Sequence, residues 1–227
     1  MSALPARDGY RLWAATYDAE NAVSYLEDAL VRELTPPLAG LRLLDAGCGT
    51  GRRLRGCGAG LAVGVDLSPE MIEAGRGDLP SHVRTMVGDV RALPLADAAF
   101  DLVWCRLVIG HLLDCGTVYR ELGRVVAPGG RVIVTDFHPA AHAAGHRRTF
   151  RNGPDVVEVE HHVHSSDTHR AGAEAAGLRL TGIREAAIGP QVRSFYERAG
   201  RMALYEEHVG LPVVLALSFA RDGRCGS

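Results

Sequence analysis

The fold of this chain is decided by an apolar stretch that ends in a glycine-rich turn, Leu43-Leu44-Asp45-Ala46-Gly47-Cys48-Gly49-Thr50-Gly51. A second apolar run follows and ends on a carboxylate, Val63-Gly64-Val65-Asp66. This pattern predicts two buried strands, over 42–46 and 61–66, joined by a tight turn and a short helix within 52–57. Glycines at alternate positions let the backbone pass close to a ligand, where any Cβ would collide. We therefore expect half of a nucleotide-binding sheet here.

The charge beside the turn indicates which nucleotide it would bind. A dinucleotide-binding turn spaces its glycines G-x-G-x-x-G and rests a pyrophosphate on the following helix. Here the spacing is G-x-G-x-G, and the adjacent Asp45 carboxylate would repel a pyrophosphate but attract an ammonium group. Asp66 can accept hydrogen bonds from two neighbouring ribose hydroxyls. These features favour S-adenosylmethionine (SAM) over NAD or FAD, with a ligand-free glycine turn as the remaining alternative.

Composition excludes several classes of protein. The chain has 227 residues, 47% hydrophobic and 23% charged, which suits one α/β domain with a full core. A net charge of −2 provides no basic field for a nucleic acid, and no apolar run is long enough to cross a membrane. All 25 basic residues are arginine, so a lysine base or Schiff base is excluded. Five cysteines without a C-x-x-C pair predict reduced thiols and a cytoplasmic location.

The rest of the chain alternates between strand-like and helix-like patterns, which predicts a doubly wound, mostly parallel sheet of seven strands in the α/β class. Further strands are expected over 83–87, 100–105, 131–136, 178–183 and 213–220. Helices are expected over much of 1–40, after the Ser68-Pro69 cap, around Val118, Leu122 and Val125, and over 167–176 and 190–209.

The segment 137–170 breaks this alternation and holds seven of the ten histidines. We expect it to form a lid over the carboxyl edge of the sheet, where doubly wound proteins bind their ligands. The predicted single domain (1–227) thus has a helical cap over 1–40, a core over 41–136, the lid, and a C-terminal completion of the sheet over 171–227. Strands 1 to 4 place four polar groups at this edge, namely Asp45, Asp66, Asp89 and Cys105.

With these motifs the chain resembles the class I SAM-dependent methyltransferases, in particular the methyltransferase type 11 or UbiE-like group. The resemblance covers about residues 10–137. It rests on Leu43–Gly51, Gly64–Met71, Gly88-Asp89-Val90, Phe100–Val103, Arg124–Arg131 and the N-terminal Trp13-x-x-x-Tyr17-Asp18. The chain departs from the family pattern after Gly51, where the expected helix is short and rich in glycine.

The resemblance implies a role in SAM binding for eleven positions. The methionine and ribose would be lined by Gly47, Gly49 and Gly51, and the ammonium would be faced by Asp45 and the Cys105 carbonyl. The ribose would be bound by Asp66. The adenine would be packed by Leu67 and Met71 and bound at its edge by Asp89 and the Val90 amide, and Tyr17 would close over the cofactor. Two of these residues also have simpler explanations, because Asp89 could be a turn carboxylate and Met71 a core residue.

Histidines are the candidate bases, since an alcohol or protonated amine must lose a proton before it accepts a methyl group. His111 follows the fourth predicted strand and His138 the fifth, so both are expected at the ligand edge. With His164, Trp13 and Tyr17 they form the predicted acceptor-binding set. The spacing His138-x-x-x-His142-x-x-x-His146 would align three imidazoles on one helix face, but we expect solvated lid histidines rather than a metal site.

The function predicted for this chain is transfer of the SAM methyl group to an oxygen, nitrogen or carbon nucleophile of a small molecule by in-line displacement. We expect it to act as a monomer or homodimer, without nucleic acid, membrane or metal. Two alternatives stay open: a SAM-fold protein that catalyses another reaction, and a non-catalytic partner subunit.

Overall fold

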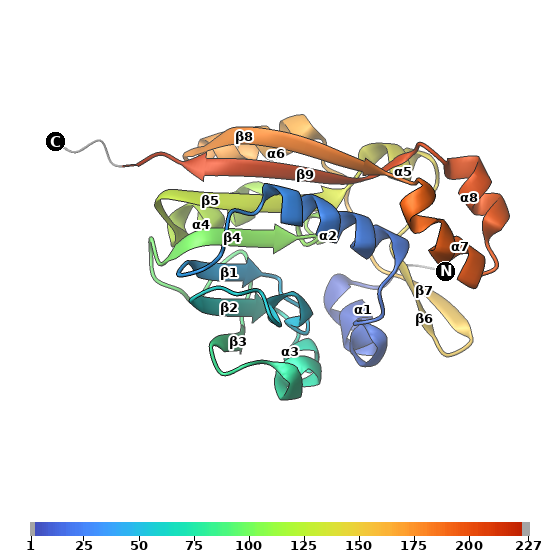
Figure 1. Ribbon diagram of the computed structural model, residues 1–227, viewed down its shortest axis with the longest axis horizontal. Coiled ribbons are helices and arrows are strands. Elements are labelled where there is room, and N and C mark those ends of the chain that lie inside the picture. Colours follow the sequence, from blue (N-terminus) through green and yellow to red (C-terminus); the bar gives the residue numbers. More distant parts are fainter. Residues whose placement is uncertain (1–2, 224–227) are drawn as a thin grey trace.

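The computed structural model describes residues 3–223, and a seven-stranded sheet forms the centre of this region (Figure 1). β9 runs antiparallel to the other six strands of this sheet, which are parallel to one another. Across the sheet the strands are β3 (Val83–Val87), β2 (Leu61–Asp66), β1 (Arg42–Ala46), β4 (Phe100–Arg106), β5 (Val126–Phe137), β9 (Pro212–Arg221) and β8 (Leu178–Ala187). The predicted fold class is therefore confirmed.

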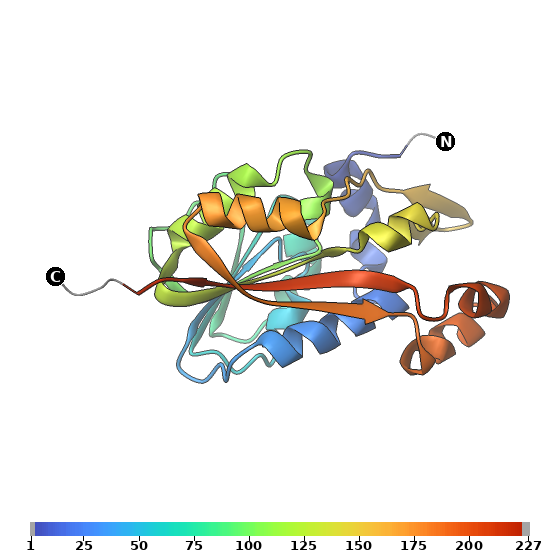
Figure 2. The ribbon, with the colours of Figure 1, turned by 90° about the horizontal axis from the view of Figure 1, so that it is seen from above.

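Helices cover both faces of the sheet, with α2 on one face and α4 and α6 on the other (Figure 2). The helices are α1 (Ala6–Trp13), α2 (Ala22–Leu34), α3 (Pro69–Gly75), α4 (Gly116–Val125), α5 (Pro139–Ala143), α6 (Ser166–Ala175), α7 (Arg193–Arg198) and α8 (Met202–His208). Short 3₁₀ turns are η1 (Ala14–Thr16), η2 (Arg52–Leu54), η3 (Arg76–Asp78), η4 (Ile109–His111) and η5 (Pro190–Val192). A hairpin of β6 (Thr149–Asn152) and β7 (Asp155–Glu158) lies, with α1 and α5, beyond the carboxyl ends of the parallel strands (Figure 1).

Local sequence explains where the helices begin. As predicted, Ser68 caps α3 by accepting a hydrogen bond from the Met71 amide, and a proline occupies the first helical position. Asn21 and Ser24 form a reciprocal capping box at the start of α2. These caps fix the direction in which each chain segment leaves the sheet.

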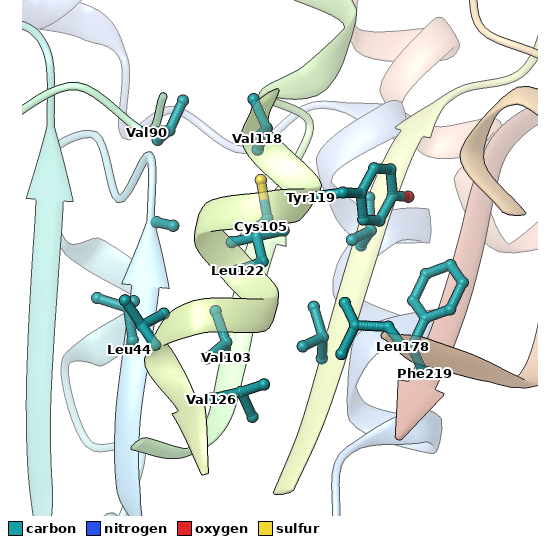
Figure 3. Close-up of a cluster of buried hydrophobic side chains, with 14 of the residues drawn as sticks. Leu44, Val90, Val103, Cys105, Val118, Tyr119, Leu122, Val126, Leu178 and Phe219 are labelled. Atoms are coloured by element: carbon teal, nitrogen blue, oxygen red, sulfur yellow. The ribbon is translucent and has the colours of Figure 1, made fainter. Parts of the chain in front are cut away.

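The main core lies between the sheet and α4 (Figure 3). Val118, Leu122 and Val125 are fully buried there, as the helical spacing predicted. The Cys105 thiol points into the same core (Figure 3), and burial raises its pKa. The carboxyl edge of the sheet is therefore backed by rigid packing.

No α-helix forms between β1 and β2, contrary to the prediction for 52–57. The chain makes only the single 3₁₀ turn η2 and then becomes extended at Arg55. Gly56 and Gly58 follow at φ 68° and 76°, a conformation that a right-handed helix cannot contain. The expected helix over 190–209 is also wrong, because it is split into η5, α7 and α8, with Gly200 at φ 65°.

The histidine-rich segment differs from the predicted pattern. Helix α5 ends at Ala143, so His138, His142 and His146 do not share one helix face. His162 and His164 lie in irregular backbone rather than on one strand. Across residues 3–223, no group of three or more histidine, cysteine or acidic side chains is placed to hold a metal ion.

The four described cysteines, Cys48, Cys57, Cys105 and Cys115, are free thiols, while Cys225 lies outside the described residues. Within 3–223, none of the helices has the length and apolar character that crossing a membrane requires.

Candidate functional site

The glycine turn is held against β2 by two backbone hydrogen bonds, since the amides of Gly47 and Cys48 both donate to the Val65 carbonyl (2.7 and 3.0 Å). Gly47 has φ 85°, and a Cβ there would lie 2.2 Å from a Val108 methyl carbon. At Gly49 (φ 59°) a Cβ would lie 3.0 Å from Met71 Cε and 3.1 Å from Tyr17 Cε1. Both glycines are therefore required by backbone geometry and by the crowded walls of the turn.

Asp45 lies beneath this turn and is fully buried. Neither of its carboxylate oxygens has a hydrogen-bond partner in the described part of the chain. Burial raises the pKa of Asp45 to about 6, although Arg106 and Arg53 act in the opposite direction. An isolated buried carboxylate is costly. A buried negative charge beneath the turn suits a positively charged ligand.

Asp66 at the end of β2 is oriented by two backbone amides. Its Oδ2 accepts from Gly49 (2.8 Å) and its Oδ1 from Ser68 (2.9 Å). Burial raises the pKa of this carboxyl despite these bonds. Each carboxylate oxygen keeps a second acceptor position, so the pair is ready for two ribose hydroxyls.

A cavity of about 110 Å³ opens between the turn and the segments that follow β2, β3 and β4. Nine predicted site residues line it together: Tyr17, Gly47, Gly49, Asp66, Leu67, Met71, Asp89, Val90 and His111. Six predicted residues lie outside its lining: Trp13, Asp45, Gly51, Cys105, His138 and His164. The local strand-end pattern thus identified most of the wall.

Asp89 does not face the cavity as a free carboxylate. It forms a chelated ion pair with Arg91, whose Nη2 lies 2.6 Å from Oδ2. This hydrogen bonding lowers the pKa of Asp89. Any ligand that binds Asp89 must therefore share it with an arginine that the sequence reasoning did not single out.

His111 is held in one tautomer. Its Nδ1 lies 3.0 Å from the Glu160 carbonyl oxygen, which can only accept, so Nδ1 carries the proton. Its Nε2 then accepts from the Tyr10 hydroxyl at 2.9 Å. Burial, with a smaller contribution from Arg148, lowers the pKa of His111 well below its ordinary value, whereas burial raises the pKa of Tyr10. The imidazole is therefore neutral, and its Nε2 lone pair is directed at the Tyr10 hydroxyl, which lines the same cavity.

The other two predicted histidines have structural partners away from this cavity. His138 caps α5, where its Nδ1 accepts from the Ala140 amide (3.0 Å), and its Nε2 lies 3.3 Å from Glu185. His164 is buried, and its Nε2 bonds to the Leu112 carbonyl (2.9 Å). His138 follows β5 as predicted and His164 lies in irregular backbone, and neither position brings the side chain to this cavity.

A buried ionic cluster below the site was not predicted. Glu27 on α2 accepts from Arg106 Nε (2.8 Å) and Nη2 (2.7 Å), from Arg53 (3.0 Å) and from Thr135 (2.8 Å). Asp28 also pairs with Arg106. Arg106 itself lines the cavity. The sequence feature that could have predicted this cluster is a glutamate, Glu27, within the apolar stripe of α2 beside Leu26 and Leu30.

Comparisons with known proteins point to one family. Residues 44–134 match the family model described as a methyltransferase domain. The chain is 31% identical to 27-O-demethylrifamycin SV methyltransferase of Amycolatopsis mediterranei, over 91% of this chain and 89% of that protein. It is 30% identical to the malonyl-(acyl-carrier protein) O-methyltransferase of Dechloromonas aromatica, over 79% of this chain and 67% of that protein. A crystal structure of a SAM-dependent methyltransferase from Mesorhizobium loti shares the fold, with a TM-score of 0.68 at 22% identity over 86% of this chain and 98% of that one.

Proposed function

Because this chain belongs to the SAM-dependent methyltransferases, we propose that it transfers the SAM methyl group to an oxygen, nitrogen or carbon nucleophile of a small molecule by in-line displacement. The observation that carries this proposal is the buried, unpartnered carboxylate of Asp45, found so within 3–223, beside the oriented carboxylate of Asp66. The Asp45 carboxylate matches a positive charge, and the Asp66 carboxylate matches the hydroxyl groups of a ribose. Together they fit a sulfonium nucleoside better than a pyrophosphate.

When bound, SAM supplies an electrophilic methyl group on sulfur. We assign Asp45 and the Cys105 carbonyl to the ammonium group, and Gly47, Gly49 and Gly51 to the methionine and ribose side. Asp66 is assigned to the ribose hydroxyls, and Tyr17 to the outer wall. For the adenine, we assign Leu67 and Met71 to the ring faces, and Asp89 and Val90 to the ring edge. These groups act by alignment, which can remove several kcal/mol of the barrier for a displacement.

His111 is the proposed base for acceptors that arrive protonated. The Glu160 carbonyl holds the Nδ1 proton, so Nε2 can take the Tyr10 hydroxyl proton while the Tyr10 oxygen takes a proton from the acceptor. As the acceptor forms its bond to the methyl carbon, the carbon–sulfur bond breaks and the sulfur leaves as a neutral thioether. His138 and His164 are poorer choices because neither lines the cavity that His111 lines.

The acceptor class is part of the proposal. The two curated relatives are named for 27-O-demethylrifamycin SV and for O-methylation of a malonyl group on acyl carrier protein. Alcohols, phenols and carboxylates are therefore the first acceptors to test. A cytoplasmic location and a monomeric or dimeric state complete the proposal.

Calorimetric titration with SAM and S-adenosylhomocysteine (SAH) tests the cofactor site. We expect the wild type to bind both, and Asp66→Asn to weaken binding by about 10- to 100-fold, the loss expected for hydrogen bonds to a charged group. Asp155→Asn, at an exposed position in the β6–β7 hairpin, is the matched control and should bind normally. Absence of SAH binding by the wild type would overturn the proposal in favour of a partner subunit.

Labelled SAM offered with panels of phenols, alcohols, amines and carboxylates tests the reaction itself. Transfer to any of these acceptors supports the methyltransferase activity. SAH binding without transfer to any acceptor would instead favour the alternative of a SAM-fold enzyme with a different reaction.

A further inference from the structure

A second cavity, of about 290 Å³, adjoins the first. Tyr17 and Leu107 line both cavities, so these two side chains form their common boundary. The second cavity is closed by the start of α2, by the end of β5 at Phe137, and by the segment between α5 and β6. It therefore occupies the place next to the cofactor cavity from which an acceptor can approach.

The polar lining of this second cavity is strongly basic. Five arginines contribute to it, namely Arg52, Arg53, Arg147, Arg148 and Arg201, and no aspartate or glutamate of the described chain does. Arg53 is neutralised by its ion pairs with Glu27 and Asp28. The other four arginines make no ion pair with any residue in 3–223.

Such an arrangement favours an anion. Guanidinium groups that converge on a partly enclosed cavity raise its positive potential, and each presents a planar fork that matches a carboxylate or phosphate. The remaining wall contains three aromatic rings, Trp13, Tyr17 and Phe137, which suit an apolar or aromatic body.

The arginines divide into two groups by their position in the chain. Arg52 and Arg53 directly follow the glycine turn, in η2. Arg147 and Arg148 come from the lid, and Arg201 precedes α8. The Arg147 Nη1 donates to the carbonyls of His142 and His146, so its guanidinium is held in place but keeps its charge unpaired within the described residues.

We propose that the second cavity is the acceptor site and that Arg147, Arg148 and Arg201 select acceptors with an apolar body and an anionic group, either carboxylate or phosphate. This inference rests on the proposed methyltransferase function and adds the substrate class to it. The anionic group is the recognition handle at the lid, and the methyl-accepting atom faces Tyr17 and Leu107.

Tryptophan fluorescence, to which Trp13 in the cavity wall contributes, provides a binding readout on the SAH-saturated protein. The titrants are benzoate, phenyl phosphate and the neutral analogue benzamide, so that the carboxylate and phosphate arms are separate. We expect at least one anion to give a saturable change and benzamide to bind at least tenfold more weakly. The Arg147→Gln/Arg201→Gln double variant should raise the Kd of that anion about tenfold or more, since charge-assisted hydrogen bonds are lost.

Two control variants separate charge from folding. Arg147→Lys/Arg201→Lys keeps the charge and should bind more tightly than the glutamine pair, while Arg151→Gln removes an exposed hairpin arginine outside the cavity and should bind like wild type. The inference is overturned if benzamide binds as tightly as both anions, if neither anion binds, or if the glutamine pair matches Arg151→Gln.

SAH calorimetry on the same samples distinguishes failure of the proposed function from failure of the anionic acceptor site. A wild type that binds no SAH refutes the proposed function. A wild type that binds SAH and methylates neutral acceptors as well as anionic ones refutes only the anionic acceptor site.

Discussion

Replacement of Glu27 by glutamine tests how the site is anchored to α2. The Glu27 carboxylate is fully buried and holds both Arg106, which lines the cofactor cavity, and Arg53, which follows the glycine turn. Glutamine has nearly the same shape but carries no charge. Two guanidinium groups would then stay buried with Asp28 as their remaining ion-pair partner in the described chain.

The size of the effect follows from the pKa of this group. Burial alone would raise the pKa of Glu27, but the charges of Arg53 and Arg106 lower it from 4.5 to about 2. At 1.36 kcal/mol per pKa unit, this difference corresponds to about 3 kcal/mol of stability at neutral pH. Because the folded-state pKa is depressed, the contribution is fully present above pH 4.5 and is lost as the pH falls toward 2. This value agrees with the loss of about 3–5 kcal/mol in stability that typically follows when one partner of a buried ion pair is removed.

Urea unfolding followed by circular dichroism at pH 7 measures this loss. The matched control is Glu33→Gln on the same helix, whose ion pair with Arg184 is half exposed on both sides. We expect about 3 kcal/mol for Glu27→Gln and less than about 1 kcal/mol for the control. Below pH 4.5 the wild type should lose this advantage over Glu27→Gln. The reasoning is refuted if both variants lose the same stability at pH 7, or if the gap between wild type and Glu27→Gln does not narrow in acid.

Three further predictions concern the cofactor and acceptor sites. Gly47→Ala should abolish SAH binding and lower the Tm, because its Cβ would lie 2.2 Å from Val108. The control Gly58→Ala has open space around it and should lose only about 1–2 kcal/mol of stability while it keeps SAH binding. Equal losses of SAH affinity by calorimetry would contradict this prediction. Since the pKa of Asp45 is about 6, wild-type SAH affinity should fall as the pH is lowered through 6, and calorimetry between pH 5 and 8 should find this dependence missing in Asp45→Asn. His111→Ala should lower kcat on phenol acceptors by about 10²- to 10⁴-fold with SAH binding retained. The wild-type rate should stay flat above pH 6.5, because the pKa of His111 lies below that value; an unchanged rate in the variant would leave alignment alone as the mechanism.

Much of the fold and of the cofactor wall was predictable because it depends on local signals. The glycine spacing over Gly47–Gly51 and the apolar run before Asp66 are readable in short windows, and the carboxyl ends of parallel strands must meet at one edge. Asp66, Asp89 and Val90 consequently line the same cavity, as predicted. The Ser68-Pro69 cap is equally local and was confirmed.

Errors arose where tertiary contacts compete with local preference. The helix expected after Gly51 is replaced by one 3₁₀ turn, because positive φ at Gly56 and Gly58 ends it and the ion pair between Arg53 and Glu27 fixes what remains. A break at Gly200 likewise divides the helix expected over 190–209. Neither outcome follows from hydrophobic periodicity.

By itself, the sequence determined the sheet, its glycine turn and the carboxylates that suit a sulfonium cofactor, since each is written in neighbouring residues. The tertiary structure alone decided which histidine reaches the cavity, because His111 and His138 both follow parallel strands but meet different partners. It also brought arginines from three distant segments, 52–53, 147–148 and 201, to one cavity. Long-range packing, which no spacing rule records, places these charges together and so sets the acceptor that the site would select.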